Sequence, residues 1–199
     1  MILDRYVVID PDERRRAALT HQIRQFDDHA QPYADINELE YHWPSEGTII
    51  VHDSDPMIGS LADLMVARGQ WLPLIAYSEA PSVDRVVKAI RCGALDYAAW
   101  PIEYPKLKFR FLETKEQWIG LLEAKQRYAQ ARMCLHDLSK REMDVLNGIA
   151  NGGSNKSIAR NLGISPRTVE IHRANMMGKL PAETSAAAIR IALESKMTN

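Results

Sequence analysis

A set of mostly polar residues follows short apolar runs in the N-terminal half of the chain. These residues are Asp10, Pro11, Asp12, His52, Asp53, Ser78 and Trp100. If the apolar runs are parallel strands, the residues that end them gather at one edge of the sheet, where open α/β sheets carry their sites. Carboxylates at such an edge could ligate a hard divalent cation. Turn chemistry also favours aspartate, so ordinary loop acids on the rim of the sheet would give the same pattern.

A second set of candidates lies near residues 166–180, because one face of the helix predicted there suits a DNA groove. That face consists of Arg167, Glu170, Ile171 and Ala174, flanked by Arg173 and Asn175. Glu170 could accept a hydrogen bond from a cytosine amino group, Ile171 could touch a thymine methyl group, and Arg167 could reach guanine or phosphate. The opposite stripe, which suits a protein core, consists of Val169, His172, Met176 and Leu180.

Phosphate contacts are expected from residues around the same helix. The candidates are Lys156, Ser165, Thr168, Arg173 and Lys179. Backbone amides at the helix start would add further donors. Each basic residue alone could equally be a solvated surface charge. The charge distribution favours binding, because roughly 16 basic and 21 acidic residues lie up to Asp137 and roughly 9 and 5 lie after it. The basic C-terminal part is therefore the candidate for binding a polyanion.

The elements that position the first set alternate between short apolar runs and amphipathic stretches. We predict strands at 6–9, 32–34, 48–52, 72–77 and 97–99. We predict helices at 13–26, 61–67 and 83–92. Gly69 and Gly93 lie where the last two helices should stop. This alternation is typical of an α/β fold, a five-stranded parallel sheet covered by helices on both faces.

A helix-turn-helix is predicted to position the second set. Ser139 and Glu142 form a capping box at the start of its first helix. A second helix covers 155–162 and is followed by a glycine turn. Ser165 then caps a third helix that has Pro166 at its first position. The motif places the candidate DNA-reading face on this third helix.

Residues 105–137 form a long, charged segment between these two parts. An imperfect 3.5-residue apolar repeat predicts a helix of up to roughly 30 residues here. Its first half is expected to close the sheet, and its second half to link the two domains and to pair two chains.

Composition argues against several classes of protein. Cys92 and Cys134 have neither metal-ligand spacing nor a companion pair, so no disulfide framework, metal site or other cofactor is expected. No apolar stretch approaches the length that spans a membrane. We therefore expect a cytoplasmic protein that is not an enzyme and has no membrane partner.

The C-terminal part resembles the LuxR-type domain of the NarL/FixJ family of response regulators, with closest likeness to the FixJ branch. The resemblance covers Leu138 to Leu193 and rests on L-S-K-R-E, on N-K-S-I-A-R-N-L-G-I-S-P-R-T-V-E-I-H-R-A-N and on K-L. It implies an all-α, four-helix domain of a sequence-specific transcription regulator. In similar domains the last helix, here at about 184–194, dimerises. The resemblance therefore implies a homodimer on an inverted repeat of double-stranded DNA.

The N-terminal part resembles the flavodoxin-like receiver domain of response regulators in two-component systems, chiefly through residues 81–101. In this resemblance Asp10 opens the acidic pair of a receiver, Ser78 takes the hydroxyl position and Tyr97 takes the aromatic switch position. Phosphoryl transfer to the receiver aspartate needs a divalent cation on carboxylates and a second cation for the new phosphate.

Two departures from the receiver pattern weaken that chemistry. Pro11 offers no side-chain oxygen at the second acidic position, and Trp100 replaces the expected lysine with an apolar ring. Either His52 or Asp53 stands at the acceptor position. We therefore expect a degenerate pocket filled by aromatic bulk, in a receiver that signals without phosphate. Alternatively, Asp12 swings in to complete a metal site and Asp53 is phosphorylated slowly.

The predicted organisation is a receiver-like domain at 1–104, a final receiver helix and interdomain linker helix at 105–137, and a LuxR-type helix-turn-helix domain at 138–199. The predicted function is transcription regulation that is independent of phosphorylation, with a regulatory protein partner in place of phosphate. Two alternatives remain: a conventional response regulator activated by phosphorylation of Asp53, and a protein-interaction antagonist that does not bind DNA.

Overall fold

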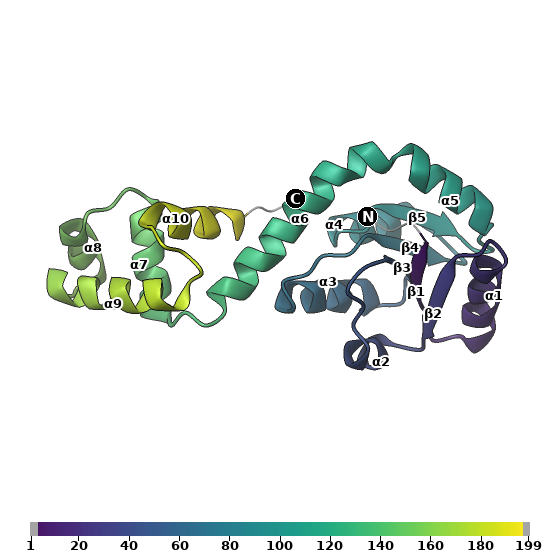
Figure 1. Cartoon of the computed structure of the whole chain (residues 1–199), viewed down its shortest axis with the longest axis horizontal. Helices are drawn as coiled ribbons and strands as arrows, with labels where there is room; N and C mark the ends of the chain where they lie inside the picture. Colours follow the sequence, from purple (N-terminus) through teal and green to yellow (C-terminus); the bar gives the residue numbers. More distant parts are fainter. Residues whose placement is uncertain (1–3, 197–199) are drawn as a thin grey trace. The chain divides into compact units, whose positions relative to one another are not determined.

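The computed structural model describes residues 4–196, which form two compact units. Unit 1 consists of Met1–Met65 and Trp71–Glu123, and unit 2 of Val66–Gln70 and Ala124–Asn199. Figure 1 shows that all five strands belong to unit 1, whereas the described part of unit 2 is helical. Within residues 4–196, no helix combines the length and the apolar composition needed to cross a membrane.

A five-stranded parallel sheet forms the centre of unit 1. Its strands are β1 Arg5–Ile9, β2 His29–Tyr33, β3 Thr48–His52, β4 Leu74–Ser78 and β5 Asp96–Ala99. They are ordered β2-β1-β3-β4-β5. Most residues of β1, β3 and β4 are buried and many are β-branched, as expected for strands covered on both faces. The predicted parallel sheet is therefore confirmed, although β2 starts three residues earlier than predicted and β4 two residues later.

The register of the sheet brings the strand ends together. Ile9 pairs with Val51, His52 with Tyr77, and Ser78 with Ala99. Because β1, β3, β4 and β5 are neighbours and parallel, the residues after their last positions share one edge. The predicted site residues lie along this edge.

Helices α1 to α5 accompany the sheet in the described part of unit 1, which also contains the first part of the next helix, Lys115–Leu135. They are α1 Glu13–Arg24, α2 Ile36–Tyr41, α3 Met57–Ala67, α4 Val83–Arg91 and α5 Tyr104–Glu113. Helix α2 was not predicted, because its six residues bury only Leu39 and give no periodic pattern. Helix α3 begins four residues before the predicted start at 61.

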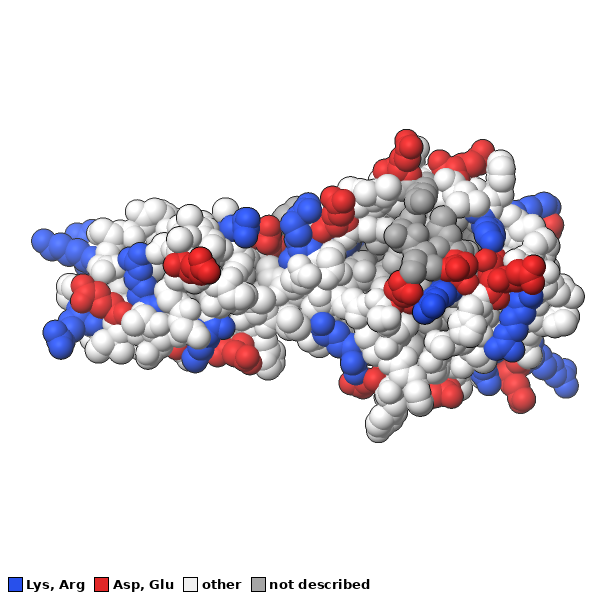
Figure 2. Space-filling view, in the orientation of Figure 1, with Lys and Arg blue, Asp and Glu red and all other residues white. Residues whose placement is uncertain are grey.

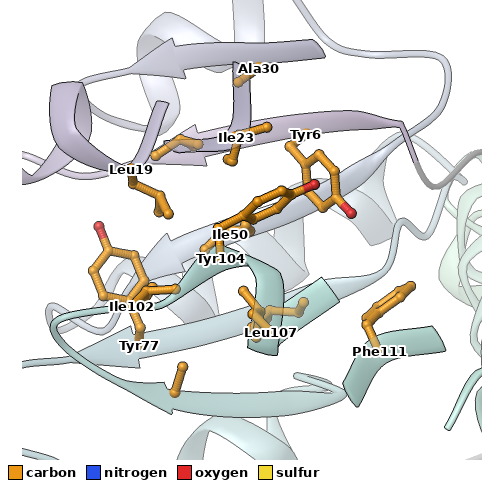
Figure 3. Close-up of a cluster of buried hydrophobic side chains, with 13 residues drawn as sticks. Tyr6, Leu19, Ile23, Ala30, Ile50, Tyr77, Ile102, Tyr104, Leu107 and Phe111 are labelled. Atoms are coloured by element: carbon orange, nitrogen blue, oxygen red, sulfur yellow. The ribbon is translucent and has the colours of Figure 1, made fainter. Parts of the chain in front are cut away.

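An apolar cluster of unit 1 lies between the sheet and helices α1 and α5 (Figure 3). Tyr104 of α5 is fully buried, and its ring meets that of Tyr6 edge-on at a centroid distance of 5.4 Å. Its hydroxyl donates to the buried carboxylate of Asp28, which also accepts from Lys108. These contacts fix α5 against the sheet.

The predicted linker helix consists of two helices. Helix α5 ends at Glu113, and α6 runs over Lys115–Leu135. At Thr114 the side-chain Oγ1 donates to the carbonyl of Arg110 at 2.8 Å. The segment for which a helix of up to roughly 30 residues was predicted therefore contains two helices, and the longer one, α6, has 21 residues.

Unit 2 contains α7 Lys140–Ala150, α8 Asn155–Leu162, α9 Pro166–Lys179 and α10 Ser185–Glu194. The predicted capping box of Ser139 and Glu142 is present. Gly163 adopts φ +66° between α8 and α9, a conformation that costs glycine little. The side chain of Ser165 accepts from the amide of Thr168 at the start of α9. The predicted helix-turn-helix is therefore confirmed.

Candidate receiver pocket and nucleic-acid interface

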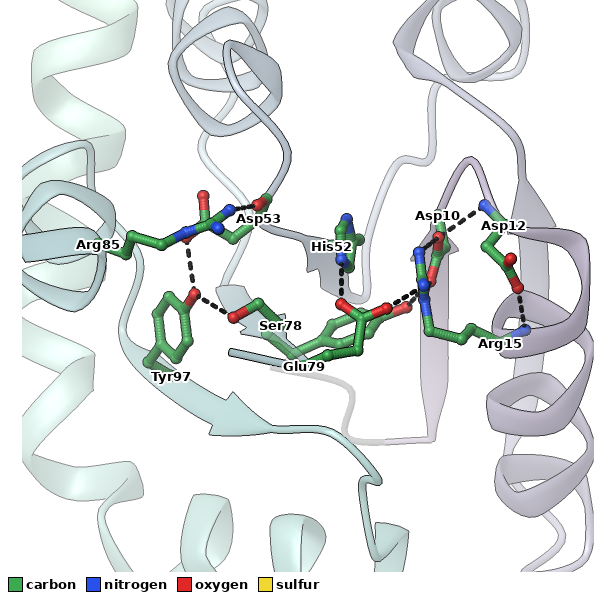
Figure 4. A network of polar contacts seen from close by, with 10 residues as sticks. Asp10, Asp12, Arg15, His52, Asp53, Ser78, Glu79, Arg85 and Tyr97 are labelled. Atoms are coloured by element: carbon green, nitrogen blue, oxygen red, sulfur yellow. Dashed lines mark hydrogen bonds and ion pairs between the residues drawn. The ribbon is translucent and has the colours of Figure 1, made fainter. Parts of the chain in front are cut away.

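Asp10 is buried at the end of β1, and its carboxylate accepts hydrogen bonds from three residues (Figure 4). Arg15 of α1 donates from Nε to Oδ2 and from Nη2 to Oδ1, each at 2.8 Å. The amide of Asp12 donates to Oδ1 at 2.8 Å, and the hydroxyl of Tyr77 donates to Oδ2. The charge of Asp10 is thus balanced by a guanidinium group from the same unit.

Burial by itself would raise the pKa of the Asp10 carboxyl, but the hydrogen bonds from Arg15 and Tyr77 outweigh it and hold this pKa below its usual range. Burial and the hydrogen bond to Asp10 raise the pKa of Tyr77. At neutral pH the pair is therefore a carboxylate and a neutral hydroxyl.

Glu79 extends this network from β4 toward β3. Its Oε1 accepts from Arg15 Nη1, and its Oε2 lies 2.8 Å from Nε2 of His52. The hydrogen bond from His52 lowers the pKa of Glu79. The Nδ1 atom of His52 is buried and has no hydrogen-bond partner among the described residues. The one contact of the His52 ring that Figure 4 marks is thus with Glu79.

Asp53 follows β3, and its carboxylate is hydrogen-bonded to residues of β5 and α4. Its Oδ2 accepts from Nε of Arg85 at 3.0 Å and from the hydroxyl of Tyr97 at 2.7 Å (Figure 4). The Tyr97 hydroxyl also lies 3.1 Å from Oγ of Ser78. The hydrogen bond to Asp53 raises the pKa of Arg85. The second carboxylate of the pocket thus also has a guanidinium partner.

The remaining predicted pocket residues lie at its margin. Asp12 caps α1, because its Oδ1 accepts from the amide of Arg15 at 2.8 Å. Pro11 is exposed. Trp100 is half-buried, packs against the apolar cluster of unit 1 and lies 5.9 Å from the ring of Tyr77. The aromatic group that contacts Asp10 is Tyr77.

Sequence reasoning did not predict the roles of Arg15, Tyr77, Glu79 and Arg85. Arg15 lies one turn into the helix that follows Asp10, and Glu79 directly follows Ser78. Proximity to the strand ends was therefore a usable signal for these two. Arg85 lies in α4 and not directly after a strand. Its position in the sequence therefore did not indicate that it would bind Asp53.

The pocket does not fit a divalent cation as it stands. Guanidinium, amide and hydroxyl donors already contact both oxygens of Asp10, and Asp12 points to the helix backbone. Within residues 4–196, no three His, Cys, Asp or Glu side chains are arranged to hold a metal ion. A cation could enter only after the Arg15 guanidinium had left the Asp10 carboxylate.

Helix α9 presents the predicted DNA-reading face to solvent. Its residues Arg167, Glu170, Ile171, Ala174 and Asn175 are exposed, whereas Val169, Met176 and Leu180 are buried. Figure 2 shows Lys and Arg side chains gathered over the end of unit 2 that α8 and α9 form. The outward and inward stripes therefore agree with the predicted ones except at His172, which is half-buried.

The predicted phosphate contacts differ in their surroundings. Lys156 is exposed, and the Oγ atom of Ser165 is bonded to Thr168 at the start of α9. Arg173 donates to Oγ of Ser185 at 2.6 Å and to Oδ1 of Asn155 at 3.5 Å. Lys179 donates to the carboxylate of Glu142 and to the carbonyl of Asp137. Two of the three cationic candidates thus already have partners within unit 2.

Comparisons with known proteins bear on the family of the chain. The family model of bacterial regulatory proteins of the luxR family matches residues 136–192, which contain α7 to α9 and most of α10. FixJ of Azorhizobium caulinodans is 33% identical over 153 residues, which make up 74% of this chain and 71% of that protein. This chain belongs to the NarL/FixJ family of response regulators.

Further FixJ proteins are similar to this NarL/FixJ-family chain. FixJ of Rhizobium meliloti is 36% identical over 138 residues, and the match covers 69% of this chain and 65% of that protein, just under two thirds of its length. The crystal structure of full-length FixJ from B. japonicum is similar over 100% of both chains, with 26% identity and a TM-score of 0.52. The NarL/FixJ-family chain therefore combines a receiver fold with a LuxR-type domain.

Proposed function

We propose that this NarL/FixJ-family chain is a sequence-specific DNA-binding transcription regulator. The match to the luxR family model over the helix-turn-helix supports this proposal, together with the exposed face of α9. Arg167, Glu170 and Ile171 would read base edges, with Ala174 and Asn175 beside them. Exposed Lys156 and the amides at the start of α9 would contact phosphates.

A homodimer on an inverted repeat is part of this proposal. In α10, Ala188 and Ala192 face the core of unit 2, whereas Ala187 is half-buried and Ala186 and Leu193 are exposed. These two exposed apolar residues, with exposed Arg190 between them, suit a contact between two copies. A two-fold axis through this contact would place two α9 helices in successive major grooves.

The second part of the proposal is that the receiver acts without phosphorylation. The observation that carries it is the pairing of Asp10 with Arg15 and of Asp53 with Arg85. A divalent cation would have to displace the Arg15 guanidinium, and a phosphoryl group on Asp53 Oδ2 would have to displace Arg85 and Tyr97. Both guanidinium groups thus supply internally the positive charge that metal and lysine supply in phosphoryl transfer.

The test is binding of the full chain to duplex DNA selected from a random pool, with and without magnesium and beryllofluoride. We expect sequence-specific binding by a dimer, equally tight in both conditions, and unchanged in the Asp53→Asn variant. Binding that requires beryllofluoride would overturn phosphorylation independence. A chain for which no sequence is selected in either condition would be a protein-interaction antagonist.

One observation favours the conventional alternative, phosphorylation of Asp53. The Oδ1 atom of this side chain takes no part in the bonds to Arg85 and Tyr97, and Ser78 lies beside the same site. Incubation with labelled acetyl phosphate separates the alternatives. Label that is taken up by the natural chain and lost in Asp53→Asn would establish the conventional mechanism.

A further inference from the structure

Lys179 is the last residue of α9, and its side chain contacts the first turn of α7 and the residues before it. Its Nζ atom lies 2.8 Å from Oε2 of Glu142 and 3.3 Å from the carbonyl oxygen of Asp137. The side chain is 42% exposed, whereas that of Glu142 is 5% exposed. A lysine that is exposed enough to be solvated is therefore paired with a buried carboxylate.

Glu142 also holds the start of α7. Its Oε2 accepts from the amide of Ser139 at 2.7 Å, and the amide of Glu142 donates to Oγ of Ser139. The hydrogen bond from Lys179, followed by that from the Ser139 amide, lowers the pKa of Glu142 to about 2. The carboxylate is therefore ionised, and Lys179 provides its cationic partner.

The contact joins three segments of unit 2. It links the end of α9 to the first turn of α7 and to Asp137, which lies two residues after α6 ends. Beneath it, Leu135, Met176 and Leu180 belong to one apolar cluster. The ion pair therefore ties the C-terminal end of α9 to α7 and to the chain leaving α6, in addition to this apolar packing.

A DNA phosphate would compete with Glu142 for the same ammonium group. If Lys179 turned to phosphate, a buried carboxylate would lose its cation, and an unpaired buried charge is strongly unfavourable. Lys156 has no such conflict: it is exposed on α8 and has no hydrogen-bond or ion-pair partner among the described residues. Phosphate binding therefore suits Lys156 and not Lys179.

We propose that Lys179 is a positioning residue, which sets the orientation of the recognition helix α9 through Glu142, and is not a phosphate contact. This inference rests on the proposed DNA binding. It predicts that Lys179 and Glu142 act as one unit, although only Lys179 carries a charge that attracts DNA.

The two roles predict opposite effects of Glu142→Gln. A positioning role predicts that Glu142→Gln and Lys179→Met each weaken binding to the selected sequence about tenfold, and that the double variant is no weaker than either single one. Binding to unrelated DNA should hardly change, because loss of orientation affects base readout. A phosphate-contact role predicts that Glu142→Gln leaves binding equal or tighter, because it frees the lysine.

The experiment measures affinity of the full chain for selected and unrelated duplexes over a series of salt concentrations. Lys156→Met is the matched control, and it should weaken binding to both duplexes and reduce the salt slope by about one. Lys179→Met should leave the slope unchanged, and Lys179→Arg should restore selective binding. Circular dichroism checks folding of each variant.

A salt slope that falls by about one in Lys179→Met, or additive effects in the double variant, would overturn the positioning role. If Lys179→Met fails to fold, the affinity of Glu142→Gln decides the question. The positioning role predicts weaker binding by this variant, and the phosphate-contact role predicts equal or tighter binding. If the natural chain binds no duplex, the proposed function fails and this inference fails with it.

Discussion

Asp10 carries a buried charge whose partners all come from the chain itself. Substituting asparagine would keep its size but leave the Arg15 guanidinium without a buried anion. We expect Asp10→Asn to lower the free energy of unfolding of unit 1 by about 3 kcal/mol, since breaking a buried ion pair costs this order of magnitude. All four tryptophans lie in unit 1, so urea unfolding followed by their fluorescence measures this change.

Asp12→Asn is the matched control for this substitution, because Asp12 lies in the same turn and asparagine also caps helices. Its effect should stay within about 0.5 kcal/mol. Equal effects of the two substitutions would show that the Asp10–Arg15 pair does not stabilise unit 1.

The same pair predicts a pH dependence. The pKa of Asp10 is lower in the folded chain than the usual value of about 3.9 for an unfolded one. Its contribution to stability is therefore complete above about pH 4 and is lost as the pH falls through the folded pKa. The difference in stability between the natural chain and Asp10→Asn should shrink below pH 4. A difference that stays constant down to pH 3 would contradict this assignment.

At the scale of elements, α4 is held to the sheet by few contacts. Ala89 is its only fully buried residue, and Arg85 and Lys88 bridge to Asp53 and Asp55. The Lys88–Asp55 pair is exposed and contributes little. We therefore expect Asp53→Ala to speed amide exchange in α4 about fivefold by promoting local opening. Hydrogen exchange with Asp55→Ala as control measures this, and equal effects of both would refute it.

Alanine substitutions at two glycines of unit 2 are expected to change its stability in opposite directions. A Cβ at Gly148 of α7 would lie 2.8 Å from Cγ1 of buried Ile158, whereas one at Gly178 of α9 meets nothing within 4 Å. Gly148→Ala should destabilise unit 2 by about 1–3 kcal/mol through overpacking. Gly178→Ala should stabilise it by about 0.5 kcal/mol, because alanine favours helix. Circular dichroism follows both changes, and effects of the same sign would contradict the packing of α7 on α8.

The sequence was sufficient to predict those helices whose ends are set by residues close to one another in the chain. Capping residues such as Ser139 and Ser165 bond to amides three residues away, so their spacing alone located α7 and α9. Thr114 gave no such signal, because threonine is tolerated within helices, so the position at which α5 ends was not predicted. The domain limits at 104, 137 and 138 stay a prediction.

The pocket was predictable only in part, for a related reason. Parallel strands bring their ends together, so Asp10, Asp53 and Ser78 could be placed at one edge from their positions after apolar runs. The donors that neutralise the two carboxylates come from helices, and which arginine turns inward depends on tertiary packing. Sequence spacing could therefore identify the acids but not Arg85 as a partner.

For the whole molecule, the internal guanidinium groups predict that magnesium does not change the stability of the fold. A ligand that binds the native state at 100 times its Kd stabilises it by about 2.7 kcal/mol. Because Arg15 takes the place of a cation on Asp10, we expect millimolar Mg²⁺ to leave the unfolding transition reported by tryptophan fluorescence unchanged. Calcium serves as a control for general salt effects. A stabilisation specific to Mg²⁺ would indicate that the metal displaces Arg15.

The pairs Asp10–Arg15 and Asp53–Arg85 also differ from an aspartyl phosphate in how long they last. An acyl phosphate hydrolyses, so a phosphorylated receiver returns to its resting state after a time that its own chemistry sets. An ion pair contains no bond that water can cleave. Under the proposed function, this receiver would hold one state for the lifetime of the polypeptide. The number of copies in the cell, and thus synthesis and degradation, would then determine the response.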